Sequence, residues 1–165
     1  VFESSTGELY IDTDRNYMTV NTPRYQGVCG EEKARAGLRD VSVELLKTRG
    51  IVSVASLQKE KGIAGADRLL LVYATNALNT GMVFTAEDMR TVTNLGKTPI
   101  LVETGSFGFR LRNGNAGDLK LYALNTDGSR RFEIPLEKEN GAVRAVIDTG
   151  TLKGGPSVYF ELAVK

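Results

Sequence analysis

Carboxylates are the first candidates for chemistry in this sequence, which contains 20 Asp and Glu side chains among 165 residues. A glycosidase needs two of them facing each other across a cleft. Most acids here, such as Glu8, Glu44 and Glu161, alternate with apolar residues in strand-like runs. That alternation predicts side chains that face solvent, so the pattern favours a solvated surface over a catalytic pair.

Histidine is absent from the chain, and this absence removes several classes of chemistry. It excludes Ser-His-Asp and Cys-His nucleophiles, histidine metal ligands and a histidine general base. The single cysteine, Cys29, can form no internal disulfide. We interpret Cys29 as a small buried side chain rather than a reactive thiol, because no histidine can lower its pKa.

Calcium ligation is suggested by one acidic segment, DTDRN at residues 12–16, which matches the start of an EF-hand loop. Its sixth position is Tyr17, where glycine is needed, and its twelfth is Pro23 instead of glutamate. The segment is therefore predicted to be a hairpin turn. We assign no metal ligand and no cofactor, while a structural calcium site assembled from separate loops stays open.

Sugar binding is the other chemistry that these residue types could perform. Tyrosine rings stack on the apolar faces of pyranoses, and arginine can donate to hydroxyl groups. The candidates are the tyrosines with polar neighbours and the arginine that follows Pro23, namely Tyr17, Arg24, Tyr25 and Tyr122. The alternative is structural: Arg24 in a hydrogen-bond network, and the tyrosines in the core or in cross-strand pairs. The sequence has no tryptophan, which is the commonest sugar platform.

Charge and hydropathy exclude two kinds of partner. The formal net charge is +1, whereas a nucleic-acid-binding domain needs a basic footprint. The longest apolar run, LLLVYA at residues 69–74, is far shorter than a membrane span. We therefore expect neither nucleic acid nor membrane as a partner. The chain starts at Val1 rather than Met, which suggests a domain excised from a larger protein.

Period-2 patterns dominate the chain and predict strands rather than helices. Residues 8–12 and 17–21 are predicted to form a hairpin, and residues 41–45 and 51–55 a second pair. Residues 68–77 are predicted to be a central strand buried on both faces, and residues 85–90 a single helical turn capped by Thr85. Further strands are predicted at 100–103, 107–112, 118–124, 131–136, 142–148 and 157–164. Residues 1–165 are thus expected to form one all-β domain, an antiparallel β-sandwich that is jelly-roll-like or immunoglobulin-like.

Several short motifs carry a resemblance to a known family. STGELY at residues 5–10 and MTVNTPRYQG at 18–27 open the pattern. It continues through VSVASL at 52–57, DRLLL at 67–71, NALNTGM at 76–82, PILVE at 99–103, LYAL at 121–124 and VYFEL at 158–162. Together they resemble the C-terminal β-sandwich accessory domain, carbohydrate-binding-like, of bacterial cellulase-like glycoside hydrolases. One loop, KEKGI at 59–63, departs from the D-G-K-P turn expected there.

The resemblance implies a non-catalytic module of a secreted or cell-surface enzyme that degrades plant cell-wall polysaccharide. The leading hypothesis is a carbohydrate-binding module that holds a cellulose-like glucan or a hemicellulose by tyrosine stacking and polar contacts. The alternative is a structural accessory domain that packs on the catalytic barrel without binding sugar. The implied partners are a polysaccharide and the catalytic domain of the same polypeptide.

Overall fold

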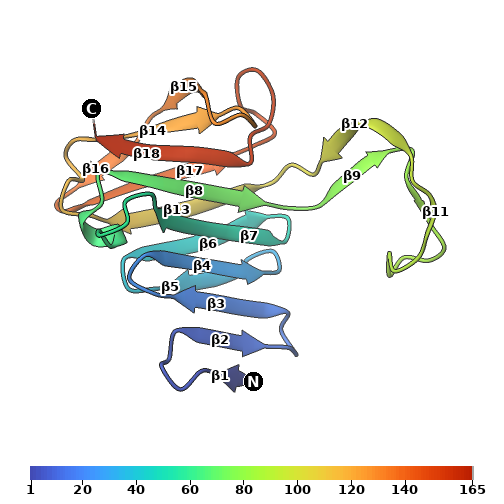
Figure 1. The fold of residues 1–165 in the computed structure, drawn as a ribbon, viewed down its shortest axis with the longest axis horizontal. Coiled ribbons are helices and arrows are strands. Elements are labelled where there is room, and N and C mark those ends of the chain that lie inside the picture. Colours follow the sequence, from blue (N-terminus) through green and yellow to red (C-terminus); the bar gives the residue numbers. More distant parts are fainter. Residues whose placement is uncertain (165) are drawn as a thin grey trace.

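The fold is an all-β antiparallel sandwich with a projecting arm (Figure 1). It was obtained as a computed structural model, which describes residues 1–164. Every strand pairing among these residues is antiparallel. The only helical element in the described chain is the short 3₁₀ turn η1 (Ile63–Gly65). The predicted fold class is confirmed.

The larger sheet has nine strands in the order β1-β2-β3-β4-β7-β8-β18-β14-β15. Their bounds are β1 Phe2–Glu3, β2 Leu9–Asp12, β3 Tyr17–Asn21, β4 Tyr25–Gly30, β7 Gly50–Ser56, β8 Arg68–Ala74, β18 Tyr159–Val164, β14 Leu119–Leu124 and β15 Arg130–Ile134.

The smaller sheet has five strands in the order β16-β17-β13-β6-β5 and lies behind the larger one in Figure 1. Their bounds are β16 Glu137–Glu139, β17 Ala142–Asp148, β13 Ser106–Arg112, β6 Val41–Lys47 and β5 Arg35–Gly37.

The predicted first hairpin is confirmed, because β2 pairs with β3 across the turn that contains DTDRN. Asn16 adopts a positive φ of 48° there, a conformation that asparagine tolerates better than most residues. The alternation predicted for β14 is also present. Leu119, Leu121 and Ala123 are fully buried, whereas Lys120 is only half-buried on the opposite face.

The predicted second pair, residues 41–45 with 51–55, is wrong. β6 pairs with β5 and β13 in the smaller sheet, whereas β7 pairs with β4 and β8 in the larger one. The turn between them, where Thr48 has a φ of 68°, carries the chain from one sheet to the other. Alternation specifies which face of a strand is apolar, and it does not specify the sheet that the strand joins.

The core lies between the two sheets and is a single cluster of buried side chains from both. At its centre the rings of Tyr73 and Phe107 lie 4.6 Å apart, and Phe160 meets Phe107 edge-on at 6.2 Å. These rings join β8, β13 and β18 across the sandwich. Burial of these rings, together with the aliphatic side chains of the same cluster, holds the two sheets together.

The arm comprises residues 75–103 and leaves the sandwich between β8 and β13 (Figure 1). Two short ribbons build it: β9 (Ala77–Thr80) pairs with β12 (Lys97–Val102), and β10 (Val83–Phe84) pairs with β11 (Val92–Asn94). The helical turn predicted for residues 85–90 is wrong, because these residues form the turn at the tip of the arm.

Candidate functional site

The outer face of the larger sheet is apolar and open over the neighbouring strands β2, β3, β4, β7 and β8. Strand β8 was predicted to be buried on both faces, but only its inner residues, such as Leu69 and Leu71, are buried by the core. Its outer residues Leu70 and Val72 are only half-buried. In Figure 1 no other element of the described chain crosses in front of this sheet. That part of the prediction is therefore wrong, because the smaller sheet covers one side only.

Strand register identifies the residues of this surface, which we call the apolar face. Residues opposite each other in an antiparallel pair project from the same side of a sheet. Because Gln26 and Val28 of β4 point into the core, their neighbours Tyr25 and Cys29 point outward. Following the register from β4 across β2, β3, β7 and β8 gives thirteen outward positions: Leu9, Ile11, Met18, Val20, Tyr25, Gly27, Cys29, Ile51, Ser53, Ala55, Leu70, Val72 and Ala74. None of these side chains is charged. The charged side chains of the same outer side begin with Arg68 at the start of β8 and continue with Glu161, Lys120 and Glu133 on β18, β14 and β15.

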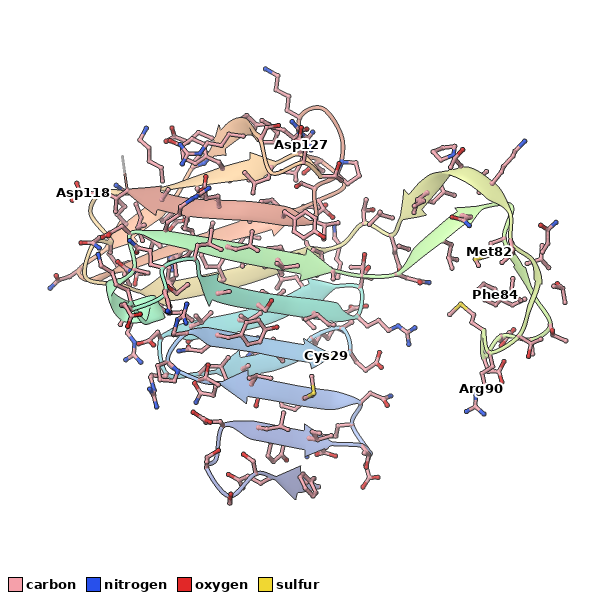
Figure 2. All side chains as sticks on the ribbon, viewed as in Figure 1. Cys29, Met82, Phe84, Arg90, Asp118 and Asp127 are labelled. Atoms are coloured by element: carbon pink, nitrogen blue, oxygen red, sulfur yellow. The ribbon has the colours of Figure 1, made fainter. Side chains whose placement is uncertain are left out.

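Cys29 was interpreted as a buried side chain, and its position corrects that interpretation. The cysteine is partly exposed and lies among the side chains in front of the larger sheet (Figure 2). Met18 lies directly opposite it on β3. The outward position of Cys29 follows from the buried positions of Val28 and Gly30 on either side of it.

The outer face of the smaller sheet, which we call the charged face, differs sharply from the apolar face. Ion pairs cross it from strand to strand, with Arg35 Nη2 2.6 Å from a Glu44 oxygen and Arg110 Nε 2.8 Å from a Glu139 oxygen. The hydrogen bond from Arg110 lowers the pKa of Glu139. Such alternation of apolar inner and charged outer side chains is typical of a solvated sheet. The apolar face lacks this pattern.

A groove lies where the larger sheet extends past the smaller one. Strands β1 and β2 project beyond β5 (Figure 1), so the inner side of β2 and β3 is partly uncovered there. We call this hollow, of about 420 Å³, the ledge groove. Its lining consists of Tyr10, Asp12, Arg15, Tyr17 and the segment from Glu31 to Arg35.

Two tyrosines and one carboxylate form the floor of the ledge groove. The rings of Tyr10 and Tyr17 meet edge-on at 6.2 Å, and the Tyr17 hydroxyl donates to the Arg35 carbonyl at 2.9 Å. Burial raises the pKa of Tyr17, and the neighbouring Tyr10 raises it further. The Asp12 side chain is only 8% exposed. Its Oδ1 accepts from the Arg15 amide at 3.3 Å, while Oδ2 has only the more distant Arg15 Nε at 3.6 Å.

The four residues predicted to bind sugar lie at three separate places. Tyr17 faces the ledge groove. Arg24 and Tyr25 lie together at the start of β4, where Arg24 Nη2 donates to the Gln58 carbonyl at 3.1 Å and Tyr25 is 40% exposed on the apolar face. Tyr122 lies four strands from β4, on β14, and the Arg130 guanidinium covers its ring at 4.1 Å.

A buried carboxylate, Glu161, is the polar feature that sequence reasoning missed. It was predicted to face solvent, yet it is only 3% exposed at the margin of the apolar face. Arg130 donates to it at 2.6 Å, and Arg68 donates to its other oxygen. Burial by itself would raise the pKa of Glu161, but the two arginines lower it below its ordinary value. The sequence contains these three charges, but they can be recognised as neighbours only when the strand order is known, because register determines which residues of adjacent strands lie opposite each other.

The segment DTDRN is a hairpin turn, as predicted. Within residues 1–164 no group of three or more carboxylate or thiol side chains is arranged to hold a metal ion.

No helix in the described part of the chain has the length and apolar character that crossing a membrane requires. Comparison with protein-family models, with curated proteins and with solved structures finds no match to this chain.

Proposed function

We propose that this chain is a non-catalytic accessory module whose function is to dock on another folded protein through the apolar face. The observation that carries the proposal is that face itself, thirteen uncharged outward-facing positions on five adjacent strands, with Arg68 at its edge. Apolar side chains that lie side by side and are reached by solvent are typical of protein interaction sites. The resemblance suggests a catalytic barrel of a bacterial, secreted or cell-surface polysaccharide-degrading enzyme as the partner.

The composition of the apolar face supports a protein partner over a sugar. Most of its side chains are aliphatic, such as Met18, Val20 and Val72, its middle pair is Gly27 with Ser53, and its one tyrosine lies at the end of a strand. Sugar-binding surfaces need hydrogen-bonding groups for the hydroxyls of the ligand. An aliphatic surface is instead complementary to another aliphatic surface, where its burial contributes roughly 25 cal/mol per Å².

The native cysteine provides the experiment that tests docking. Cys29 can be coupled to a maleimide photocrosslinker and irradiated in an extract of cells that make the protein. We expect a specific crosslinked product whose partner is identified by mass spectrometry. The matched control carries Cys29→Ser and Val146→Cys, which moves the probe to the charged face, where Val146 is 71% exposed. Equal products from both positions, or none from Cys29, would rule out docking through the apolar face.

Carbohydrate binding is the second candidate function, and the ledge groove favours it. There two tyrosine rings lie beside a nearly buried carboxylate, Asp12, whose Oδ2 accepts no hydrogen bond from the described residues. A ring for stacking and a free acceptor are the groups that a saccharide requires. The groove also contains both acidic and basic side chains, which suits a neutral ligand.

Affinity gel electrophoresis against soluble glucan, mannan, xylan and pectin tests this second function. We expect retardation by at least one polysaccharide, which Tyr10→Ala and Asp12→Asn abolish. Tyr25→Ala serves as the control, because Tyr25 lies outside the ledge groove. Retardation that persists in Tyr10→Ala but disappears in Tyr25→Ala would move the site to the apolar face, and no retardation at all would reject carbohydrate binding.

A further inference from the structure

The arm is a second apolar surface without a partner in the described chain. Its strands pair only with each other, and the hydrogen bond from the Glu103 amide to the Asn76 carbonyl at 2.8 Å joins its two chain segments at the root. Two-stranded ribbons are marginally stable in water when nothing covers them. Six exposed apolar side chains lie on this arm, namely Val83, Met89, Val92, Leu95, Ile100 and Leu101.

The shape of the arm prevents it from covering its own apolar face. The arm extends outward from the sandwich and then bends, with Met82 and Phe84 on the concave side of the bend and Arg90 at the tip (Figure 2). It begins directly after Ala74, the last residue of the apolar face on β8. The two apolar surfaces are therefore neighbours at one edge of the molecule, and neither covers the other.

We propose that the chain forms a twofold dimer in which the arm of each copy lies on the apolar face of the other. This inference rests on the proposed docking function and names a second copy as the occupant of the face, in place of a catalytic domain. In this dimer the arm and the apolar face of each copy are both covered by the other copy. Such reciprocal contacts are the usual form of twofold interfaces.

The area of the contact favours a second copy over an unrelated partner for the arm. From strand spacing and rise, one face of the two-stranded arm measures about 300 Å². An arm on a single foreign surface would bury about 600 Å² in total, below the roughly 1,200 Å² at which stable specific interfaces begin. Two reciprocal arms bury about 1,200 Å² and reach that limit.

Charge is also matched between the two surfaces. The apolar face has no charged side chain at its thirteen positions. Three charged residues lie at the tip of the arm, beyond its apolar strands, namely Glu87, Asp88 and Arg90. Lys97 is the one charged side chain of the four ribbon strands, so contact between the ribbon and the face desolvates at most that charge and the penalty that opposes binding is small.

Sedimentation equilibrium of the purified chain over a wide concentration range tests the dimer. We expect a dimer whose dissociation constant rises at least about thirtyfold in an arm variant, Leu95→Glu with Ile100→Glu, and in a face variant, Met18→Lys with Val20→Lys. Val146→Glu is the matched control, because Val146 is 71% exposed and Leu95 is 70% exposed. We expect it to remain dimeric. Urea unfolding verifies that each variant is folded.

Mixing the arm variant with the face variant gives the sharpest result. The heterodimer retains one unaltered arm-on-face contact and gains one contact between glutamates and lysines, so mixing should restore the dimer. A contact between two arms predicts no restoration and would overturn the proposal. So would a dimer that survives in both variants, or a monomeric wild-type chain. If the wild-type chain is monomeric, a crosslink from Cys29 to another protein would still support the proposed docking function.

Discussion

At the scale of single residues, the clearest electrostatic feature is Glu161 between Arg68 and Arg130. The carboxylate is buried, whereas both guanidinium groups are largely exposed. Burying a charge is costly unless hydrogen bonds compensate it, and here both carboxylate oxygens accept one. Arg130 also covers the ring of Tyr122. One acidic side chain thus orders the polar contacts of β8, β14, β15 and β18.

Replacing this carboxylate changes how stability depends on pH. The pKa of folded Glu161 lies below its unfolded value of about 4.3, so its contribution is present above that pH. The contribution is lost as the pH falls through the folded pKa. We expect Glu161→Gln to lower the free energy of unfolding by about 1–3 kcal/mol at neutral pH and by clearly less at pH values below the folded pKa. Urea unfolding at both pH values measures this, and an equal difference at both would contradict it.

At the scale of elements, the arm is separable from the sandwich. The ribbons β9–β12 and β10–β11 are not joined to either sheet by strand pairing. The largest buried side chains lie outside residues 75–103, so the core does not depend on the arm. Elements with few buried apolar contacts open at low free energy and contribute little to global stability.

Deleting the arm should therefore leave the sandwich intact. Replacement of residues 77–102 by Asn-Gly keeps Asn76 and Glu103 beside each other at the root, where they already share a backbone hydrogen bond. We expect the free energy of unfolding of the monomer to change by less than about 1 kcal/mol. Urea unfolding at low protein concentration measures this change. A loss of several kcal/mol would instead place the arm within the cooperative fold.

At the scale of the whole molecule, the two sides of the larger sheet differ in what covers them. The inner side packs against the smaller sheet in one continuous core. The outer side carries the apolar face on β2, β3, β4, β7 and β8 and the ion pairs of Glu161 and Lys120 on β18, β14 and β15. Successive residues of a strand therefore differ in burial although both are apolar.

Leu70 and Leu71 test this difference on one strand. Leu71 is fully buried in the core, whereas Leu70 is half-buried on the apolar face. We expect Leu71→Ala to lower the free energy of unfolding by about 2–5 kcal/mol, because it leaves a cavity. Leu70→Ala should cost less than about 1.5 kcal/mol in the monomer, because solvent already reaches the site. Chemical denaturation at protein concentrations where the chain is monomeric compares the free energies of unfolding of the two variants. Similar losses in both would mean that the apolar face is covered.

Local patterns predicted much of the fold and little of the site. The hairpin of β2 and β3 and the buried side of β14 follow from alternation and turn residues. The predicted pairing of residues 41–45 with 51–55 was wrong because alternation of apolar and polar residues suits a strand in either sheet. The arm was not predicted, since its residues are apolar enough for a core and nothing in their order indicates that they project into solvent.

The sequence by itself determined an all-β chain without histidine chemistry, because side-chain alternation and composition are local properties of the residues. Only the tertiary structure decided that β8 is covered on one side and that Glu161 is enclosed by two arginines. It also decided that Tyr17 is separated from Tyr25 and Tyr122. These features depend on which strands become neighbours, and strand order is fixed by packing between segments far apart in the sequence.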